Sequence, residues 1–180
     1  MAKTLYLVRH TTPQIAAGIC YGQTDVAVTD SFIDEAAEVS DWLPPPELII
    51  SSPLQRSQRL ATFLAQAHHC ELRSDDRLME MHFGDWEGKA WQDIARSEID
   101  AWSADTLHYA PPSGESAQQM SLRVQSMLRD VARLPQQHIA LVAHGGSIRA
   151  ALAQLAGIPL PQTLGWQIDY GAVIGAQLRD

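Results

Sequence analysis

Two runs of β-prone residues, one near each end of the chain, each stop at a histidine, and this pattern constrains the fold more than any other. The first run is Thr4–Val8, which Arg9 and His10 follow. The second run is His138–Ala143, which His144 follows. Short continuous apolar runs are typical of buried parallel strands. Ligands bind at the carboxyl edge of open α/β sheets, so we expect the two histidines and the arginine to share one site.

Helix and strand patterns alternate between these two runs. Apolar spacing and turn residues predict helices over residues 31–43, 53–68, 90–102, 115–134 and 146–156. Further strands are predicted at 48–50, 70–74, 166–170 and 172–178. Ser52 and Ser113 are the expected N-caps of the second and fourth helices, with Pro53 in the first helical position.

This alternation predicts a three-layer α/β/α sandwich over a mostly parallel sheet. The last two strands follow each other too closely for a helical crossover, so one antiparallel strand is expected. The loop over residues 11–29 directly follows His10 and is expected to cover the site. Arg56 lies four residues before Leu60 and shares the apolar face of its helix, so it should point inward toward the same sheet edge.

Length and charge limit the possible partners. The chain has 180 residues and is expected to form one domain over residues 1–180. Its 13 basic and 21 acidic residues give a formal charge of −8, which argues against nucleic acid or an anionic membrane as the partner. An anionic small molecule must then be held by a local cluster of positive groups. The expected assembly is a monomer or a homodimer.

The cysteines and the apolar runs of the sequence indicate the cellular compartment. The two cysteines, Cys20 and Cys70, are interpreted as free thiols of a reducing compartment. Neither a secretory signal nor a run of about 18 apolar residues is visible, so a cytoplasmic protein is expected.

Histidines, arginines and helix N-termini at one sheet edge suit phosphoryl chemistry. A neutral imidazole is a good nucleophile near pH 7, and the planar fork of arginine matches phosphate oxygens. The alternative is that each histidine is a hydrogen-bonded core residue and Arg56 a salt-bridged cap. The run His68–Cys70 suggests a metal, but consecutive histidines cannot easily face one ion and no matching pair is evident. We therefore expect neither a metal nor another cofactor.

Four motifs in this chain resemble those of the histidine phosphatase superfamily, which comprises cofactor-dependent phosphoglycerate mutases and related phosphatases. In order, they are LVRHT at 7–11, SSPLQRS at 51–57, EMHFGDWEG at 80–88 and VAHGG at 142–146. The resemblance implies a phosphoglycerate mutase-like fold and metal-independent catalysis. It implies that His10 attacks phosphorus and becomes a phosphohistidine. It also implies roles for Arg9, Arg56 and His144 in holding the phosphoryl oxygens, and for Glu80 in protonating the leaving oxygen and later activating water.

Three positions depart from the family pattern. Thr11 stands where glycine usually follows the nucleophile, and Ala16 replaces an asparagine that often contacts phosphate. A glycine usual in the first helix is replaced near Phe32. These departures keep open a non-catalytic phosphate-binding module, and Asp85 and Glu87 remain rivals to the predicted acid.

Within the superfamily, residues 18–26 (GICYGQTDV) and the Trp86–Gly88 ending resemble the alpha-ribazole phosphatase branch, which acts in cobalamin nucleotide-loop assembly. The chain has little room for the insertion with which related mutases close over a bisphosphate, so water is the expected acceptor. The expected substrate is alpha-ribazole 5′-phosphate, and the alternative is another small ester, such as a sugar acid phosphate, or a phosphoprotein. The expected substrate-binding residues are Tyr21, Gly22, Gln23 and Gly145. For Tyr21 and Gln23, packing within the loop is an equal alternative to substrate contact. Trp166 or Tyr170 could also line the pocket.

Overall fold

A five-stranded sheet lies at the centre of the computed structural model, which describes residues 3–178. Its strands are β1 (Lys3–Arg9), β2 (Leu48–Ser51), β3 (Glu71–Ser74), β4 (His138–Ala143) and β5 (Val173–Leu178). Their order across the sheet is β3-β2-β4-β1-β5, and each neighbouring pair is parallel except β1 and β5. The prediction of a mostly parallel sheet with one antiparallel strand is therefore confirmed.

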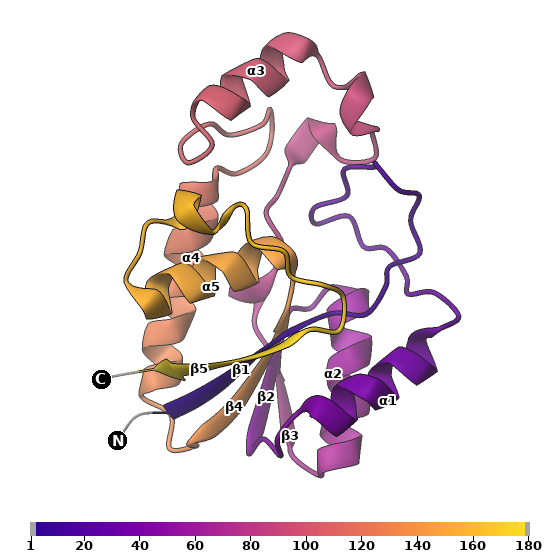
Figure 1. Cartoon of the computed structure of the whole chain (residues 1–180), viewed down its shortest axis with the longest axis vertical. Helices are drawn as coiled ribbons and strands as arrows, with labels where there is room; N and C mark the ends of the chain where they lie inside the picture. The colour runs from indigo at the N-terminus through magenta and orange to yellow at the C-terminus, as the bar shows by residue number, and fades with distance from the viewer. Residues whose placement is uncertain (1–2, 179–180) are drawn as a thin grey trace.

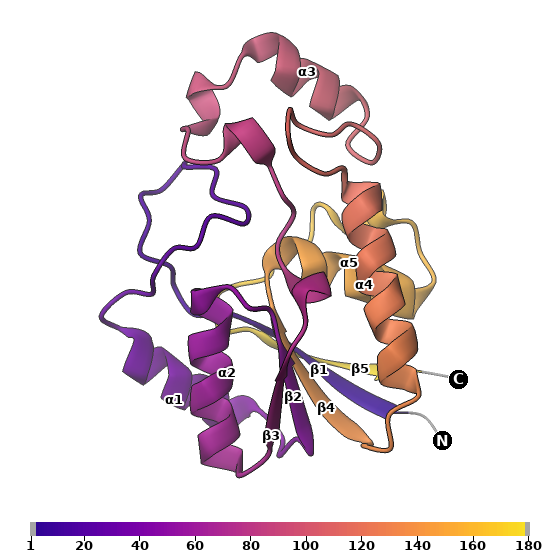
Figure 2. The same ribbon diagram turned by 180° about the vertical axis from the view of Figure 1, so that it is seen from behind.

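Helices cover both faces of this sheet (Figures 1 and 2). One face carries α1 (Phe32–Trp42) and α2 (Gln55–His68), and the other carries α4 (Ala117–Ala132) and α5 (Gly145–Ala156). The helix α3 (Arg96–Ala104) lies apart from both layers, at the top of Figure 1. Of the helices within residues 3–178, none is long and apolar enough to cross a membrane.

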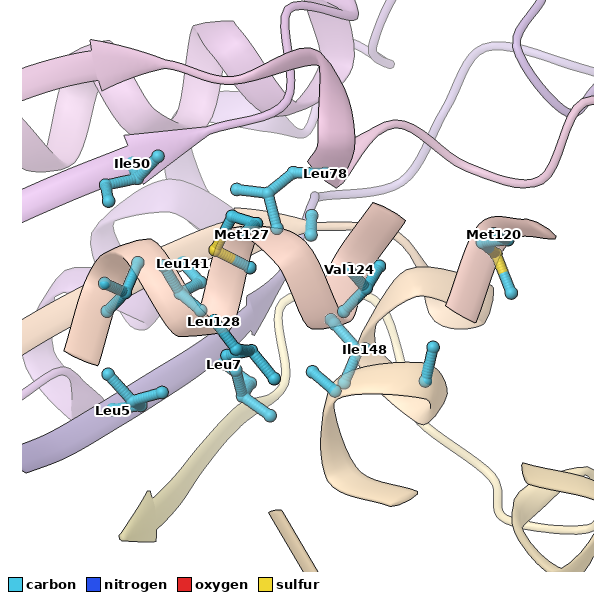
Figure 3. Packing of buried hydrophobic residues seen from close by; sticks show 14 of the residues in the cluster. Leu5, Leu7, Ile50, Leu78, Met120, Val124, Met127, Leu128, Leu141 and Ile148 are labelled. Carbon is cyan, nitrogen blue, oxygen red and sulfur yellow. The ribbon is translucent and has the colours of Figure 1, made fainter. Parts of the chain in front are cut away.

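The two helical layers pack on alternate residues of the strands. Leu5 and Leu7 of β1 belong to the apolar cluster with α4 and α5, whereas Tyr6 and Val8 belong to the cluster with α1 and α2. This is the period of two expected for a strand that is buried on both faces. Figure 3 shows the first cluster, in which α4 contributes Met120, Val124, Met127 and Leu128. Packing from both sides holds the ends of β1 and β4 in place.

A separate aromatic cluster builds a cap, which we define as residues 83–109 together with residues 18–22. Cys20, Trp86 and Ile94 are buried at its centre, and further aromatic rings pack around them. The Trp86 indole donates a hydrogen bond to Glu98 of α3 (2.5 Å), and Ile19 forms an isolated bridge with Ala90. The first loop and the segment around α3 are therefore packed as one unit.

Two helices begin later than predicted. The predicted start of α2 at Pro53 is wrong, and the helix begins at Gln55, because the Ser52 N–H continues the strand ladder to Val142 O (3.0 Å). The predicted N-cap Ser113 is also wrong. Ser113 has a left-handed backbone (φ 60°), and α4 is instead capped by Ser116, whose hydroxyl accepts from the Gln119 N–H in a capping box.

Two predicted elements are absent from the described chain in their expected form. Residues 90–102 split into a 3-10 turn (Trp91–Asp93) and α3, because Ile94 is extended and buried in the aromatic cluster. Residues 166–170 do not form a strand. Instead, the Gly171 N–H donates to the carbonyls of Arg9 and His10 (both 3.2 Å), which turns this segment over the end of β1.

Candidate active site

The register of the sheet brings the two predicted histidines together. Arg9 of β1 pairs with Ala143 of β4, so His10 and His144 leave the sheet at the same edge. The centroids of their rings are 5.1 Å apart, and both residues are almost fully buried. The His10 N–H donates to Ala143 O (3.1 Å) and fixes the backbone at this point.

The hydrogen bonds of His10 determine its tautomer. Its Nδ1 lies 2.7 Å from the Thr11 carbonyl oxygen, which can only accept, so Nδ1 carries the hydrogen. The lone pair is then on Nε2. Burial lowers the pKa of His10 from 6.5 to about 3; the Thr11 carbonyl raises it in part, while Arg56 and Arg9 lower it further. His10 is therefore neutral near pH 7 and its Nε2 is free to act as a nucleophile.

His144 is held by two serine hydroxyls. Its Nε2 lies 2.8 Å from Ser52 Oγ and 3.3 Å from Ser57 Oγ. Burial lowers the pKa of His144 well below its usual value, and the charges of the neighbouring arginines lower it further. The late start of α2 thus leaves the Ser52 hydroxyl to orient this ring.

Two arginines complete a positively charged cup, which we define as Arg9, His10, Arg56 and His144. Arg56 is completely buried, as its spacing on the helix predicts. Its Nη1 donates to Thr24 O (2.8 Å) and its Nη2 to Gly22 O (2.6 Å), while Arg9 Nη1 donates to Ile168 O. Each guanidinium is therefore fixed by backbone carbonyls from a loop at the carboxyl edge.

Several buried polar atoms of the cup and of the adjoining Thr11 have no hydrogen-bond partner within residues 3–178. They include the nitrogens Arg9 Nε, Arg56 Nε and His144 Nδ1, together with Thr11 Oγ1. A buried polar atom left unpaired costs about 1–3 kcal/mol. These three nitrogens, which belong to the neighbours of the His10 imidazole, fit an anion with several acceptor oxygens, such as a phosphoryl group.

Glu80 reaches the cup from the segment after β3. Its Oε1 accepts from the Met81 N–H (2.8 Å) and its Oε2 from the Gly146 N–H (3.0 Å), in the first turn of α5. The rival Glu87 is occupied elsewhere, because its oxygens accept from the N–H groups of residues 23, 24 and 83. The other rival, Asp85, is exposed. The geometry thus favours Glu80 among the three carboxylates.

Two tyrosines from distant loops meet beside the cup. Arg56 Cζ lies 5.1 Å from the Tyr21 ring centroid, and Arg9 Cζ lies 4.0 Å from the Tyr170 ring centroid. The two phenol oxygens are 3.1 Å apart, and the Tyr170 ring is 5.5 Å from that of His10. Burial and the bond between the phenols raise the pKa of Tyr21. The pair has two protons and uses one in its mutual bond, so the other can be donated to an anion.

The remaining predicted substrate-binding residues have clear structural contacts. Gly22 has a positive φ (36°), and a Cβ there would lie 2.3 Å from Glu87 Oε1. The Gln23 amide donates to the Glu80 carbonyl (2.9 Å). A Cβ on Gly145 would lie 3.3 Å from Arg149 Nη1 and 3.6 Å from Arg9 Cζ. Their direct contact with a substrate stays a prediction.

Arg149 is a cation near the cup that was not predicted from the sequence. It lies one turn after Gly145 on α5, and its guanidinium donates twice to Trp166 O (2.8 and 3.0 Å). Its position four residues after Gly145 is the signal that could have identified it.

A cavity of about 300 Å³ adjoins the cup. Glu80, Gly146 and Arg149 form its polar side together with Thr106. The rest of the lining is apolar and consists of Met81, Phe83, Trp102, Ala117, Met120, Leu160 and Leu164. A leaving group attached to a phosphoryl group in the cup would thus meet a mostly apolar surface. No three His, Cys, Asp or Glu residues lie together as possible metal ligands anywhere in residues 3–178.

Comparisons with known proteins agree with this geometry. The family model described as histidine phosphatase superfamily (branch 1) matches residues 5–180. The chain is 29% identical over 177 residues to the adenosylcobalamin/alpha-ribazole phosphatase of Escherichia coli (strain K12), covering 93% of this chain and 86% of that protein. It is 30% identical over 179 residues to the glucosyl-3-phosphoglycerate phosphatase of Mycobacterium tuberculosis (strain H37Rv), covering 88% of this chain and 78% of that protein. The crystal structure of the alpha-ribazole phosphatase from Shigella flexneri superposes with a TM-score of 0.87 at 27% identity, covering 96% of this chain and 89% of that one.

Proposed function

The chain belongs to the histidine phosphatase superfamily and is a phosphatase, and from this premise we propose that it hydrolyses alpha-ribazole 5′-phosphate through a phosphohistidine at His10. The observation that carries the proposal is the neutral, buried imidazole of His10 within the positively charged cup. Its Nδ1 hydrogen is held by Thr11 O, which leaves Nε2 as the attacking atom.

In the first step, His10 Nε2 attacks phosphorus and the bond from phosphorus to the ester oxygen breaks. Glu80 gives its proton to the leaving oxygen, so the alcohol departs neutral. Arg9, Arg56 and His144 donate to the equatorial oxygens, where negative charge is concentrated in the transition state.

In the second step, the Glu80 carboxylate takes a proton from water as the water oxygen attacks the phosphohistidine. The bond between phosphorus and Nε2 breaks, and inorganic phosphate forms. His10 returns to its neutral state and Glu80 to its protonated state, so the site is ready for another ester.

The apolar cavity beside Glu80 supports an aromatic leaving group. Alpha-ribazole carries a flat dimethylbenzimidazole on its ribose, whereas a sugar acid would bring several hydroxyls against apolar side chains. Burying hydroxyls without hydrogen-bond partners costs about 1–3 kcal/mol each. Two relatives named for alpha-ribazole, one from Escherichia coli and one from Shigella flexneri, also support this substrate.

The proposed substrate is tested by a panel of phosphate monoesters ranked by kcat/KM. Ribose 5-phosphate is the matched control, because it has the same ester without the aromatic base. Burying the base should raise kcat/KM for alpha-ribazole 5′-phosphate about 10- to 100-fold over ribose 5-phosphate. Equal values would refute the substrate, and a higher value for glucosyl-3-phosphoglycerate would favour the sugar acid alternative.

Two variants test the site and the cavity separately. Leu164 lines the cavity and is 46% exposed, so Leu164→Asn should fold and should lower the preference for the aromatic ester. Leu122→Asn is its control, since Leu122 is also exposed but does not line the cavity. His10→Ala should abolish turnover of every ester. Phosphate binding without turnover by the unaltered protein would instead support a non-catalytic module.

A further inference from the structure

The segment that carries Glu80 has little regular structure of its own. Between β3 and the cap it contains only a short 3-10 turn, Asp76–Leu78. Backbone carbonyls in such a segment need hydrogen-bond partners from elsewhere in the fold. A side chain that supplies these partners also determines where the Glu80 carboxylate lies.

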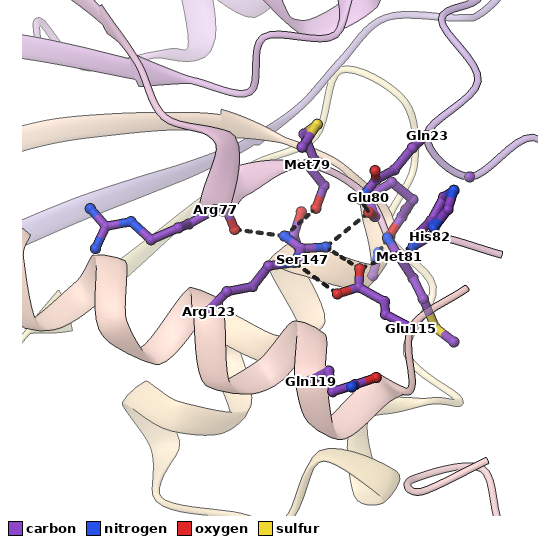
Figure 4. Close-up of polar contacts among 12 residues, drawn as sticks. Gln23, Arg77, Met79, Glu80, Met81, His82, Glu115, Gln119, Arg123 and Ser147 are labelled. Carbon is purple, nitrogen blue, oxygen red and sulfur yellow. Dashed lines mark hydrogen bonds and ion pairs between the residues drawn. The ribbon is translucent and has the colours of Figure 1, made fainter. Parts of the chain in front are cut away.

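One arginine of α4 supplies hydrogen bonds to three of them (Figure 4). Arg123 Nη1 donates to Arg77 O and Met79 O, both at 2.7 Å, and Nη2 donates to Glu80 O at 2.9 Å. The planar guanidinium thus holds three carbonyls within four residues of chain. A lysine has no such fork and cannot reproduce this arrangement.

Arg123 is itself fixed by Glu115, just before α4. Its Nε lies 3.1 Å from Glu115 Oε2 and its Nη2 lies 2.6 Å from Glu115 Oε1. Both side chains are less than a fifth exposed, which strengthens the ion pair. Glu115 Oε1 also accepts from the His82 N–H (3.0 Å), so the pair holds the backbone on both sides of Glu80.

We propose that Arg123 is a positioning residue that sets the location of the Glu80 carboxylate in the site. The inference rests on the proposed function, because it takes Glu80 as the acid. With Arg123 in place, the Glu80 carbonyl is fixed from α4 and the carboxylate is fixed by the Gly146 N–H of α5. Without Arg123, the carbonyls of residues 77 and 79 lose this donor, the Glu80 carbonyl keeps only the Gln23 amide (2.9 Å), and the segment can shift. A displacement of about 1 Å can cost about 100-fold in rate.

The chain offers a matched control in Arg77. This residue also ties the same segment to α4, through Asp130 (2.7 Å), and it pairs with Asp75 (2.7 Å). Its side chain donates to none of the carbonyls of residues 79 and 80 among its described bonds. Arg77→Met therefore removes one positive charge and the ion pairs with Asp130 and Asp75, as Arg123→Met removes one positive charge and its ion pair. It leaves the hydrogen bond from Arg123 to the Glu80 carbonyl in place.

The experiment compares two esters that differ in their need for an acid. Departure of an alkoxide requires a proton, whereas p-nitrophenolate leaves readily without one. Arg123→Met should lower kcat/KM about 100-fold for alpha-ribazole 5′-phosphate and less than about fivefold for p-nitrophenyl phosphate. Arg123→Lys should restore only part of the loss, and Arg77→Met should change neither value more than about twofold. The affinity for inorganic phosphate should stay within about twofold in all three variants, since neither Arg123 nor Arg77 forms a hydrogen bond with a residue of the cup within residues 3–178.

Equal losses on the two esters, or no loss on either, would overturn the inference. If Arg123→Met fails to fold, Arg123→Lys and Glu115→Gln carry the same comparison. Glu80→Gln separates this inference from the proposed function. If Glu80→Gln is selective for the alkyl ester and Arg123→Met is not, only the positioning role fails. If Glu80→Gln shows no selectivity, the acid role itself fails.

Discussion

Acidifying the protein from pH 7 to pH 5, without phosphate or sulfate, should destabilise it through His10 and His144. Both are buried and neutral, with the pKa of His10 lowered to about 3 and that of His144 well below its usual value. Between pH 6.5 and about 3 the unfolded chain binds more protons than the folded one. The free energy of unfolding therefore rises with pH across this window and falls as the solution is acidified.

The size of the effect follows from the unfolded state. A histidine with an unfolded pKa of 6.5 stabilises the unfolded chain by RT ln(1 + 10^(6.5 − pH)), which is about 2 kcal/mol at pH 5 and about 0.2 kcal/mol at pH 7. The result does not depend on the exact folded pKa while that pKa stays below about 4. His10 alone should therefore cost about 2 kcal/mol, a sizeable share of a typical stability of about 5–15 kcal/mol, and the lowered pKa of His144 adds a loss in the same direction.

Denaturant unfolding at the two pH values measures this loss. His10→Asn keeps a donor near Thr11 O and should recover about 2 kcal/mol of the pH-dependent loss. His144→Gln keeps a polar group near Ser52 Oγ and should recover a further part of that loss. His69→Asn is the control, because His69 is exposed and has a left-handed backbone (φ 54°) that asparagine also adopts. The reasoning is refuted if both buried variants lose as much stability as the wild type between pH 7 and pH 5.

Three further predictions concern the parts of the site one at a time. A Cβ on Gly146 would lie 2.2 Å from Glu80 Oε1, so Gly146→Ala should displace the carboxylate by about 1 Å and lower kcat/KM for an alkyl phosphate about 100-fold. Gly175→Ala, where a Cβ meets nothing within 4 Å, should have no effect, and an active Gly146→Ala enzyme would contradict the role of Glu80. Arg56→Met should remove the rise in melting temperature that inorganic phosphate gives the wild type, and a retained rise would show that the anion binds elsewhere. Tyr170→Phe keeps the ring beside Arg9 but loses the hydroxyl, so phosphate should bind about tenfold more weakly. Unchanged affinity in a calorimetric titration would mean that the two phenols only pack together.

The parts of the site predicted from sequence are those that local patterns determine. His10 and His144 each end an apolar run, and parallel strands place such ends at one edge. Arg56 shares an apolar helix face with Leu60, which was enough to predict its burial. In each case one strand or helix decides where the side chain points.

The parts that were missed depend on contacts between distant segments. The turn at Gly171 depends on hydrogen bonds to the carbonyls of residues 9 and 10. These partners are distant in the sequence, so the pattern of residues 166–170 alone predicts a strand. Arg123 and Arg149 bind carbonyls whose positions exist only in the folded chain. The start of α2 moves for the same reason, because Ser52 extends the strand ladder to β4. Apart from the spacing of Arg149 from Gly145, no local pattern contains this information.

The role of His10 as the nucleophile is tested most directly by locating the phosphoryl group on the enzyme during turnover. Protein mixed with alpha-ribazole 5′-phosphate is quenched in alkali, in which phosphohistidine survives, and is then examined by peptide mass spectrometry and NMR. One phosphoryl group is expected on Nε2 of His10, because Nδ1 donates its hydrogen to Thr11 O. A phosphoryl group on Nδ1 or on another residue, or turnover with no phosphoenzyme at any time point, would contradict it.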